Sequence, residues 1–229
     1  GKDGKTRKEI KPLTDDAKRL ESTTQKQQGV LKLQEAYARL GFSQQEILNL
    51  TEDTINGSIA LNAELADTAE LTGAIVRTFD DFNTTDAGLI LDQLTLSTQK
   101  SALNFEKLQT ALPVVAGAAN TAGISFTRLL GLLGKLSDSG IDASSSSTAL
   151  RNIFIESASQ GLTYEDTLKK VANSADKLTA LTDAFGKSSA FSMSFAIKDQ
   201  VFIFFPSLFH RQLVSVQKKH LLLLLALMM

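Results

Sequence analysis

The residue types that most often carry chemistry are few in this chain and stand apart from one another. The 229 residues include no cysteine, which excludes disulfides, thiolate metal sites and a cysteine nucleophile. The two histidines, His210 and His220, lie in a C-terminal segment with a single acidic residue, so we expect no metal site there. Glu156, Glu165 and Asp166 flank a glycine and could form an acid–base pair. We interpret them instead as helix-end carboxylates, which the helix dipole favours near an N-terminus.

The segment Gly131-Leu-Leu-Gly134-Lys135 resembles a phosphate-binding loop only in part. That motif requires four residues between its glycines, a Ser or Thr after the lysine, and a preceding strand. Here two residues separate the glycines, Leu136 follows the lysine, and a helical pattern precedes the segment. We interpret the glycines as small residues that let a neighbouring helix approach. The sequence therefore predicts no catalytic, cofactor-binding or metal-binding residues, and we do not expect an enzyme.

One short phrase recurs between the apolar stretches: a glycine, an apolar residue, and a residue that commonly caps helices. Glycine can end a helix in the left-handed conformation that a Cβ disfavours. The Ser, Thr or Asp that follows can accept a hydrogen bond from a free N–H group of the next helix. Two of these phrases, through Glu46 and Asp166, also have the spacing of a capping box. The predicted corners are Gly41 with Ser43, Gly123 with Ser125, Gly140 with Asp142, and Gly161 with Thr163.

Between these corners, apolar residues repeat at intervals of three and four, the period of an α-helix with one buried face. No alternation of apolar and polar residues long enough for a sheet occurs before residue 195. Pro113 is expected to break or kink its helix and so to form a further corner, because proline lacks an N–H group and clashes with the preceding turn. We predict an all-α fold, a compact array of short helices and helical hairpins. The expected helices cover residues 13–28, 30–40, 46–56, 58–79, 86–96, 105–112, 126–137, 144–157, 164–175 and 177–185.

Charge and hydropathy divide the chain into three parts. Residues 1–12 are polar and basic, and we expect this end to be frayed. Residues 13–190 form the helical region, and within 36–190 acidic residues outnumber basic ones by 18 to 11, which disfavours a sequence-independent grip on DNA phosphates. Residues 191–229 are hydrophobic and contain the runs Val201–Phe205 and Leu221–Met229. The longer run falls well short of the ~20 helical residues that cross a bilayer, so we expect no membrane contact. The abrupt change in composition favours a truncated or frame-shifted gene end.

Several short segments, in this order and spacing, resemble the core region of phage tail tape measure proteins over roughly residues 10–190. They are Leu13–Leu20, Tyr37–Ser43, Ala63–Gly73, Asp86–Gly88, Ala111–Ala116, Gly123–Ser125, Asp138–Ile141 and Thr148–Arg151. The resemblance implies a structural protein of the virion tail, without a cofactor, that scaffolds tail assembly and sets tail length. It implies assembly in the host bacterial cytoplasm, a place in the tail lumen, and expulsion ahead of the DNA at infection.

The resemblance also implies partners. They are the tail tube protein, tail assembly chaperones, tail-tip or baseplate proteins, and further copies of the same chain in the tail. The residues alone leave two other interpretations open. One is a helical adaptor between proteins, or a secreted bacterial effector, that shares the helix-corner pattern. The other is a non-functional prophage remnant. Neighbouring genes for a tail tube protein, a chaperone and a baseplate would favour the tape measure.

Overall fold

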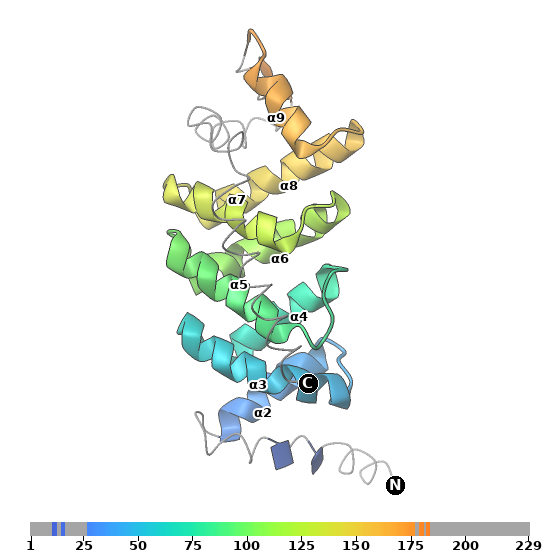
Figure 1. Cartoon of the computed structure of the whole chain (residues 1–229), viewed down its shortest axis with the longest axis vertical. Helices are drawn as coiled ribbons and strands as arrows, with labels where there is room; N and C mark the ends of the chain where they lie inside the picture. The colour runs from blue at the N-terminus through green and yellow to red at the C-terminus, as the bar shows by residue number, and fades with distance from the viewer. Residues whose placement is uncertain (1–10, 13–14, 17–26, 177–178, 181, 184–229) are drawn as a thin grey trace, which may run out of the picture. The chain divides into compact units, whose positions relative to one another are not determined.

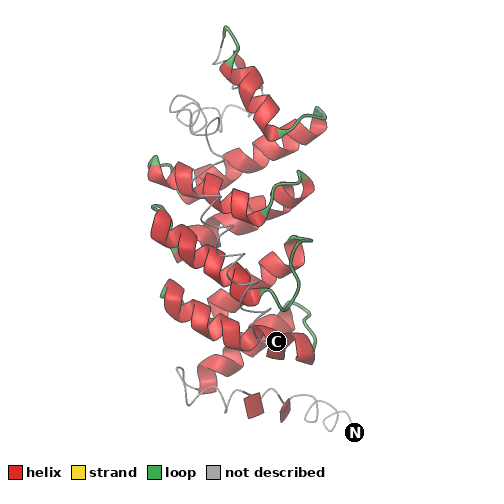
Figure 2. Ribbon diagram, in the orientation of Figure 1, coloured by secondary structure: helices red, strands yellow, loops and turns green. Residues whose placement is uncertain are grey.

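The computed structural model of the chain describes residues 11–12, 15–16, 27–176, 179–180 and 182–183. Throughout this part the regular structure is helical and no strand occurs, which confirms the all-α prediction for these residues (Figure 2). The hydrophobic segment beyond residue 190 and most of the expected helices 13–28 and 177–185 fall outside the described residues. The helices are α2 (Gln27–Arg39), α3 (Gln44–Leu61), α4 (Leu65–Thr78), α5 (Ala87–Lys100), α6 (Phe105–Thr121), α7 (Phe126–Asp138), α8 (Ala143–Ser159) and α9 (Tyr164–Ala172).

The chain divides into two compact units, Gly1–Thr95 and Leu96–Met229, and helix α5 crosses the boundary. In the first unit α2 packs most extensively against α4, and α3 contacts both. In the second unit α6 packs most extensively against α8, α7 contacts both, and α9 packs against α8. Each unit therefore uses the same arrangement, in which a helix returns to lie beside the helix two places before it (Figure 1).

The core of the first unit is built on the helical period of α2. Val30, Leu33 and Tyr37 follow one another at three and four residues, and all three are buried. The Tyr37 ring packs edge-on against Phe42, with ring centroids 5.6 Å apart. Its hydroxyl shares a 2.6 Å hydrogen bond with the Thr54 hydroxyl, so this polar group has a partner inside the core. Burial raises the pKa of Tyr37 well above its ordinary value of about 10.

Glycine lets helices of the first unit approach closely. A Cβ added at Gly57 of α3 would lie 2.5 Å from Cδ2 of Leu91 in α5, which is far inside van der Waals contact. At Gly73 of α4, a Cβ would lie 2.6 Å from Cδ1 of Leu40. Any larger residue at either position would push the neighbouring side chain away, because packed cores have little free volume. Gly57 therefore lets α3 lie against Leu91 of α5, and Gly73 lets α4 lie against Leu40 in the turn after α2.

The second unit buries α7 on almost all sides. Its leucines at five positions are buried, as are Gly131 and Gly134 between them. A helix that is apolar around most of its circumference has to lie inside a protein, not on its surface. Two small residues, Ala119 of α6 and Ala149 of α8, are also fully buried. The buried leucines of α7 are Leu129, Leu130, Leu132, Leu133 and Leu136.

The single helix expected over residues 58–79 is wrong. Helix α3 ends at Leu61, Asn62 takes the left-handed conformation with φ 51°, and α4 begins at Leu65. The N–H of Asn62 donates to the carbonyl of Ile59, and the N–H of Ala63 donates to that of Ser58. This is a corner of the same kind as those at glycine, because asparagine also tolerates the left-handed region.

Candidate protein-interaction surface

Four glycines end helices in the left-handed conformation. The φ angles are 81° at Gly41, 69° at Gly123, 78° at Gly140 and 64° at Gly161. At each corner the glycine N–H donates to the carbonyl three residues earlier, and the next N–H donates to the carbonyl five residues earlier. This pair of bonds is the Schellman motif, which satisfies carbonyl groups that the end of a helix would otherwise leave unpaired. The chain can therefore turn sharply at each of these positions.

Two of the following helices begin with strong side-chain caps. The Ser43 hydroxyl accepts a hydrogen bond from the Glu46 N–H, and the Glu46 carboxylate accepts one of 2.7 Å from the Ser43 N–H, so the capping box is complete. That second bond, from the backbone N–H of Ser43, lowers the pKa of Glu46. Asp142 accepts a 2.9 Å bond from the Ser145 N–H at the start of α8, and this bond lowers the pKa of Asp142.

The other two caps differ from the sequence prediction. Thr163 accepts a hydrogen bond from the Asp166 N–H, but the Asp166 carboxylate accepts from the Thr163 hydroxyl and not from its backbone N–H. Only half of the expected box therefore forms. Ser125 stands at the N-cap position of α7, yet its side chain makes no capping hydrogen bond. The start of α7 is held instead by burial, because Phe126 and Leu129 of its first turns are both inside the core.

No corner forms at Pro113. Helix α6 runs from Phe105 to Thr121 through Pro113, so the expected break is wrong. Proline removes one N–H donor, but Pro113 lies on the exposed side of the helix, where water can reach the freed carbonyl group. Val115 and Ala119, which follow the proline, are fully buried. Packing of this second half therefore outweighs the local cost of the proline.

The carboxylates that could have formed an acid–base pair are each occupied by a neighbour. Glu156 accepts a 2.7 Å hydrogen bond from the side-chain amide of Gln160. Glu165 forms an ion pair with Arg128. Asp166 caps α9 with Thr163 and lies 3.8 Å from the Lys169 ammonium. These contacts are those of helix ends.

The glycines at 131 and 134 lie inside α7 and form no loop. A Cβ at Gly134 would lie 3.1 Å from the side chain of Ser101, so the glycine admits a close neighbour. Ser101 lies in the loop between α5 and α6, so the segment that approaches Gly134 is a loop and not a second helix. In this helical segment the backbone N–H groups donate to carbonyls one turn earlier, so they offer no cradle for a phosphate.

Two polar clusters of the second unit hold elements together and were not anticipated from the sequence. Arg128 of α7 donates a 2.8 Å hydrogen bond from Nε to the Tyr164 hydroxyl, and its guanidinium lies 4.9 Å from the centre of that ring. The Tyr164 ring packs edge-on against Phe154 of α8 at 5.7 Å. Arg128 and Tyr164 lie 36 residues apart. No local sequence pattern predicts a contact between them.

The second cluster fixes the loop between α5 and α6 to the end of α7. Lys107 donates from Nζ to the Ala102 carbonyl at 2.7 Å and to the Ser137 hydroxyl at 3.0 Å. The Ala102 N–H in turn donates a 2.6 Å bond to the Asp138 carboxylate. These side chains stabilise a turn.

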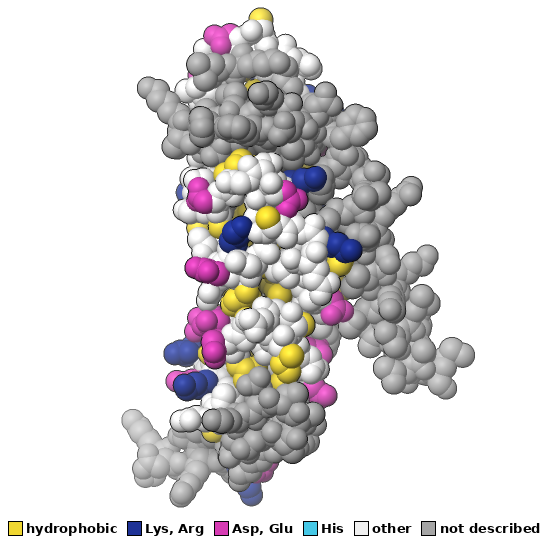
Figure 3. Space-filling view, turned by 90° about the vertical axis from the view of Figure 1, so that its left-hand side faces the viewer, with side chains coloured by type: hydrophobic (Ala, Val, Ile, Leu, Met, Phe, Trp, Pro, Cys, Tyr) yellow, Lys and Arg dark blue, Asp and Glu magenta, His cyan; other side chains and the backbone are white. Residues whose placement is uncertain are grey.

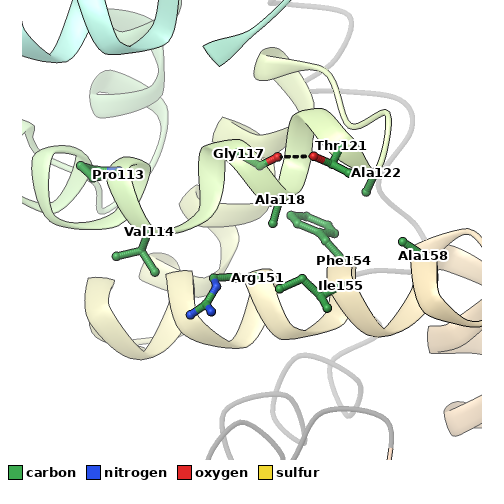
Figure 4. Close-up of a pocket in the computed structure, with 10 residues that line it drawn as sticks. All are labelled: Pro113, Val114, Gly117, Ala118, Thr121, Ala122, Arg151, Phe154, Ile155 and Ala158. Atoms are coloured by element: carbon green, nitrogen blue, oxygen red, sulfur yellow. Dashed lines mark hydrogen bonds between the residues drawn. The ribbon is translucent and has the colours of Figure 1, made fainter. Parts of the chain in front are cut away.

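An open apolar groove runs between α6 and α8 (Figure 4). It has a volume of about 310 Å³, and among the described residues that line it Arg151 is the one that carries a charge. Val114 and Ile155, which face this groove from α6 and α8, are 39% and 50% exposed. A groove without convergent polar groups suits another apolar protein segment better than a small charged ligand. The lining residues are Pro113, Val114, Gly117, Ala118, Thr121, Ala122, Arg151, Phe154, Ile155 and Ala158.

The rest of the visible surface carries mixed charge. In the view of Figure 3, acidic and basic side chains lie close together, with small hydrophobic areas among polar ones. Within the residues that the structure describes, no three His, Asp or Glu side chains gather as a metal site. None of the described helices is both long and apolar enough to cross a membrane.

The described residues form short capped helices that pack through small and aliphatic faces. They carry an apolar groove, and no catalytic group is assembled among them. This part of the chain is a helical structural module. The chain belongs to the phage-related minor tail protein family, whose model matches residues 14–199. The match begins one residue after the start predicted for the helical region and ends nine residues beyond residue 190. No curated protein and no solved structure matches the chain. Membership gives the protein a structural role in a phage tail, among other tail proteins.

Proposed function

We propose that this chain is the helical core of a tail tape measure protein, which scaffolds tail assembly and sets how many tube rings stack. The family match over residues 14–199 carries the proposal, because it covers most of the chain. The protein then acts as a structural component and not as an enzyme, and it needs no cofactor. It assembles in the host cytoplasm, lies in the tail lumen and leaves ahead of the DNA at infection.

The helix lengths bear on how such a protein would act. A helix rises 1.5 Å per residue, so the number of residues in an extended helix can become a tail length. The longest helix of the described part, α3, has 18 residues and is about 27 Å long. The others are shorter and turn back at the corners, so these residues would add little to a ruler. We propose that they form a compact module that docks to tail-tip or baseplate proteins.

Charge supports the same assignment. Acidic residues exceed basic ones by 18 to 11 within residues 36–190. A net negative surface repels DNA phosphates, so a protein in the tube would not retain the DNA that passes after it. The tube protein, the assembly chaperones and further copies of this chain are the remaining proposed partners.

The test is an in-frame deletion of residues 41–151 in the phage genome, with tails counted and measured by electron microscopy. We expect few or no assembled tails, because a docking module that starts assembly is lost. A straight helical ruler would instead give tails in normal number, shortened by about 165 Å. That result would contradict the docking module, and tails of normal number and length would contradict the tape measure itself. As a control, Ser139→Ala on an exposed corner should leave tails unchanged.

A further inference from the structure

The groove between α6 and α8 has a defined length and direction. Pro113 and Val114 lie near Arg151 at one end, and Ala122 lies near Ala158 at the other, so the two helices run parallel along it (Figure 4). From residue 113 to residue 122 a helix extends about 13.5 Å. The groove is therefore about two and a half helical turns long.

Gly117 in the middle of this groove has no packing role among the described residues. A Cβ at Gly117 would meet nothing within 4 Å, whereas Gly57, Gly73 and Gly134 each face a close neighbour. Gly117 also lies inside α6 and not at a left-handed corner. A glycine in a helix interior costs about 0.5–1 kcal/mol relative to alanine. Room for a further segment against α6 would account for it.

We propose that residues Leu221–Met229 of the same chain bind in this groove as a short helix. The segment is nine residues long and contains only Leu, Ala and Met. In a helix it extends about 13.5 Å, which matches the groove. Burying it removes a large apolar surface from water, at about 25 cal/mol for each Å². This inference does not depend on the function proposed above, because it needs only the groove and the sequence that follows Asp183.

The other apolar run of the same region, Val201–Phe205, fits the groove less well. Its aromatic and β-branched residues favour an extended strand. A strand placed against two helices would leave its own N–H and C=O groups without partners, whereas a helix pairs them internally. The small residues of the groove also accept the flexible side chains of Leu and Met more readily than a row of rings.

Charge gives the bound segment a direction. Lys218 and Lys219 precede it, with His220 between them and Leu221. Cations are favoured at the C-terminal end of a helix, and α8 ends at Ser159, beyond Ala158 of the groove. Arg151 at the opposite end would repel the lysines. The segment therefore runs antiparallel to α6 and α8. The 37 residues between Asp183 and Leu221 allow an average reach of about 33 Å if they behave as a flexible chain.

The absence of cysteine from the chain makes a clean test possible. The pair Ile155→Cys and Leu224→Cys is introduced into the full chain, and circular dichroism checks that the helix content is unchanged. Under mild oxidation we expect an intramolecular disulfide, found by mass spectrometry in the monomer. It should form at least tenfold faster than in the control pair Lys135→Cys and Leu224→Cys, because Lys135 is exposed on α7 and does not line the groove.

Four results would overturn the proposal. A disulfide that joins two chains would show that a second copy covers the groove. A faster disulfide in the pair Ile155→Cys and Phe204→Cys would assign the groove to the other apolar run. Equal rates in the test and control pairs, or no disulfide at all, would show that the segment does not bind there.

Discussion

Replacing Gly57 by alanine tests the claim that glycine sets the distance between α3 and α5. The new Cβ would lie 2.5 Å from Cδ2 and 2.8 Å from Cγ of Leu91. Because Cγ is itself too close and Leu91 is only 2% exposed, a change of rotamer cannot remove the clash. Overpacking costs about 1–3 kcal/mol, and the better helix propensity of alanine returns about 0.5–1 kcal/mol. We expect a net loss of about 1–2 kcal/mol in the free energy of unfolding.

A double-mutant cycle with Leu91→Ala isolates this clash. Leu91→Ala alone should cost about 2–5 kcal/mol, because it leaves a cavity in a buried position. In that background the Cβ of Gly57→Ala enters free space, so the same substitution should become stabilising by about 0.5–1 kcal/mol. Denaturant unfolding followed by circular dichroism measures all four proteins. Additive effects, or a Gly57→Ala variant as stable as the original, would refute the reasoning.

Three other predictions concern the corners, the caps and the tyrosines. Gly140→Ala should lower the free energy of unfolding by about 1–2 kcal/mol, because φ is 78° at this position. Gly140→Asn should cost less, because asparagine tolerates the left-handed region. Equal stability of the two variants in denaturant unfolding would count against this prediction. The hydrogen bond from the Ser145 N–H lowers the pKa of Asp142 in the folded state. The ionised carboxylate therefore makes the protein more stable than the Asp142→Asn variant above the unfolded pKa of about 4. This extra stability is lost as the pH falls through the folded pKa. Thermal unfolding from pH 7 to pH 3 checks this, and a difference that grows on acidification would contradict it. Burial raises the pKa of Tyr164 to about 12 and that of Tyr37 further, so absorbance titration of these two tyrosines should show no ionisation near pH 10 until the chain unfolds. Their contribution to stability is complete below pH ~10 and is lost as the pH rises through the folded pKa values, and a normal tyrosinate signal from the folded protein would exclude this burial.

The fold could be predicted where a residue type has only one good use. A glycine between two apolar helical patterns marked the corners at Gly41 and Gly140, because few other residues accept φ near 80°. The corner at Asn62 was missed, because asparagine also occurs inside helices and the apolar period continued through it. The break expected at Pro113 was wrong for the opposite reason. A strong local rule was overridden there by burial of the residues that follow, and burial depends on contacts far apart in the sequence.

The surface features could not be predicted from local patterns. Arg128 meets Tyr164 only because α7 and α9 both pack against α8, and no spacing rule connects positions 36 residues apart. The groove exists because α6 and α8 lie side by side. In the sequence, Val114 and Ile155 are ordinary apolar residues of two separate helices. The sequence contains no cysteine and two histidines, so local patterns alone defined no candidate site.

Mass spectrometry of purified virions tests the central claim most directly, namely that this helical chain is a structural part of the phage tail. Peptides from residues 27–176 should occur in intact particles at a fixed ratio to the tail tube protein. If the chain is also the proposed tape measure, the same peptides should be depleted from particles that have ejected their DNA. Intact tails without these peptides would contradict the account.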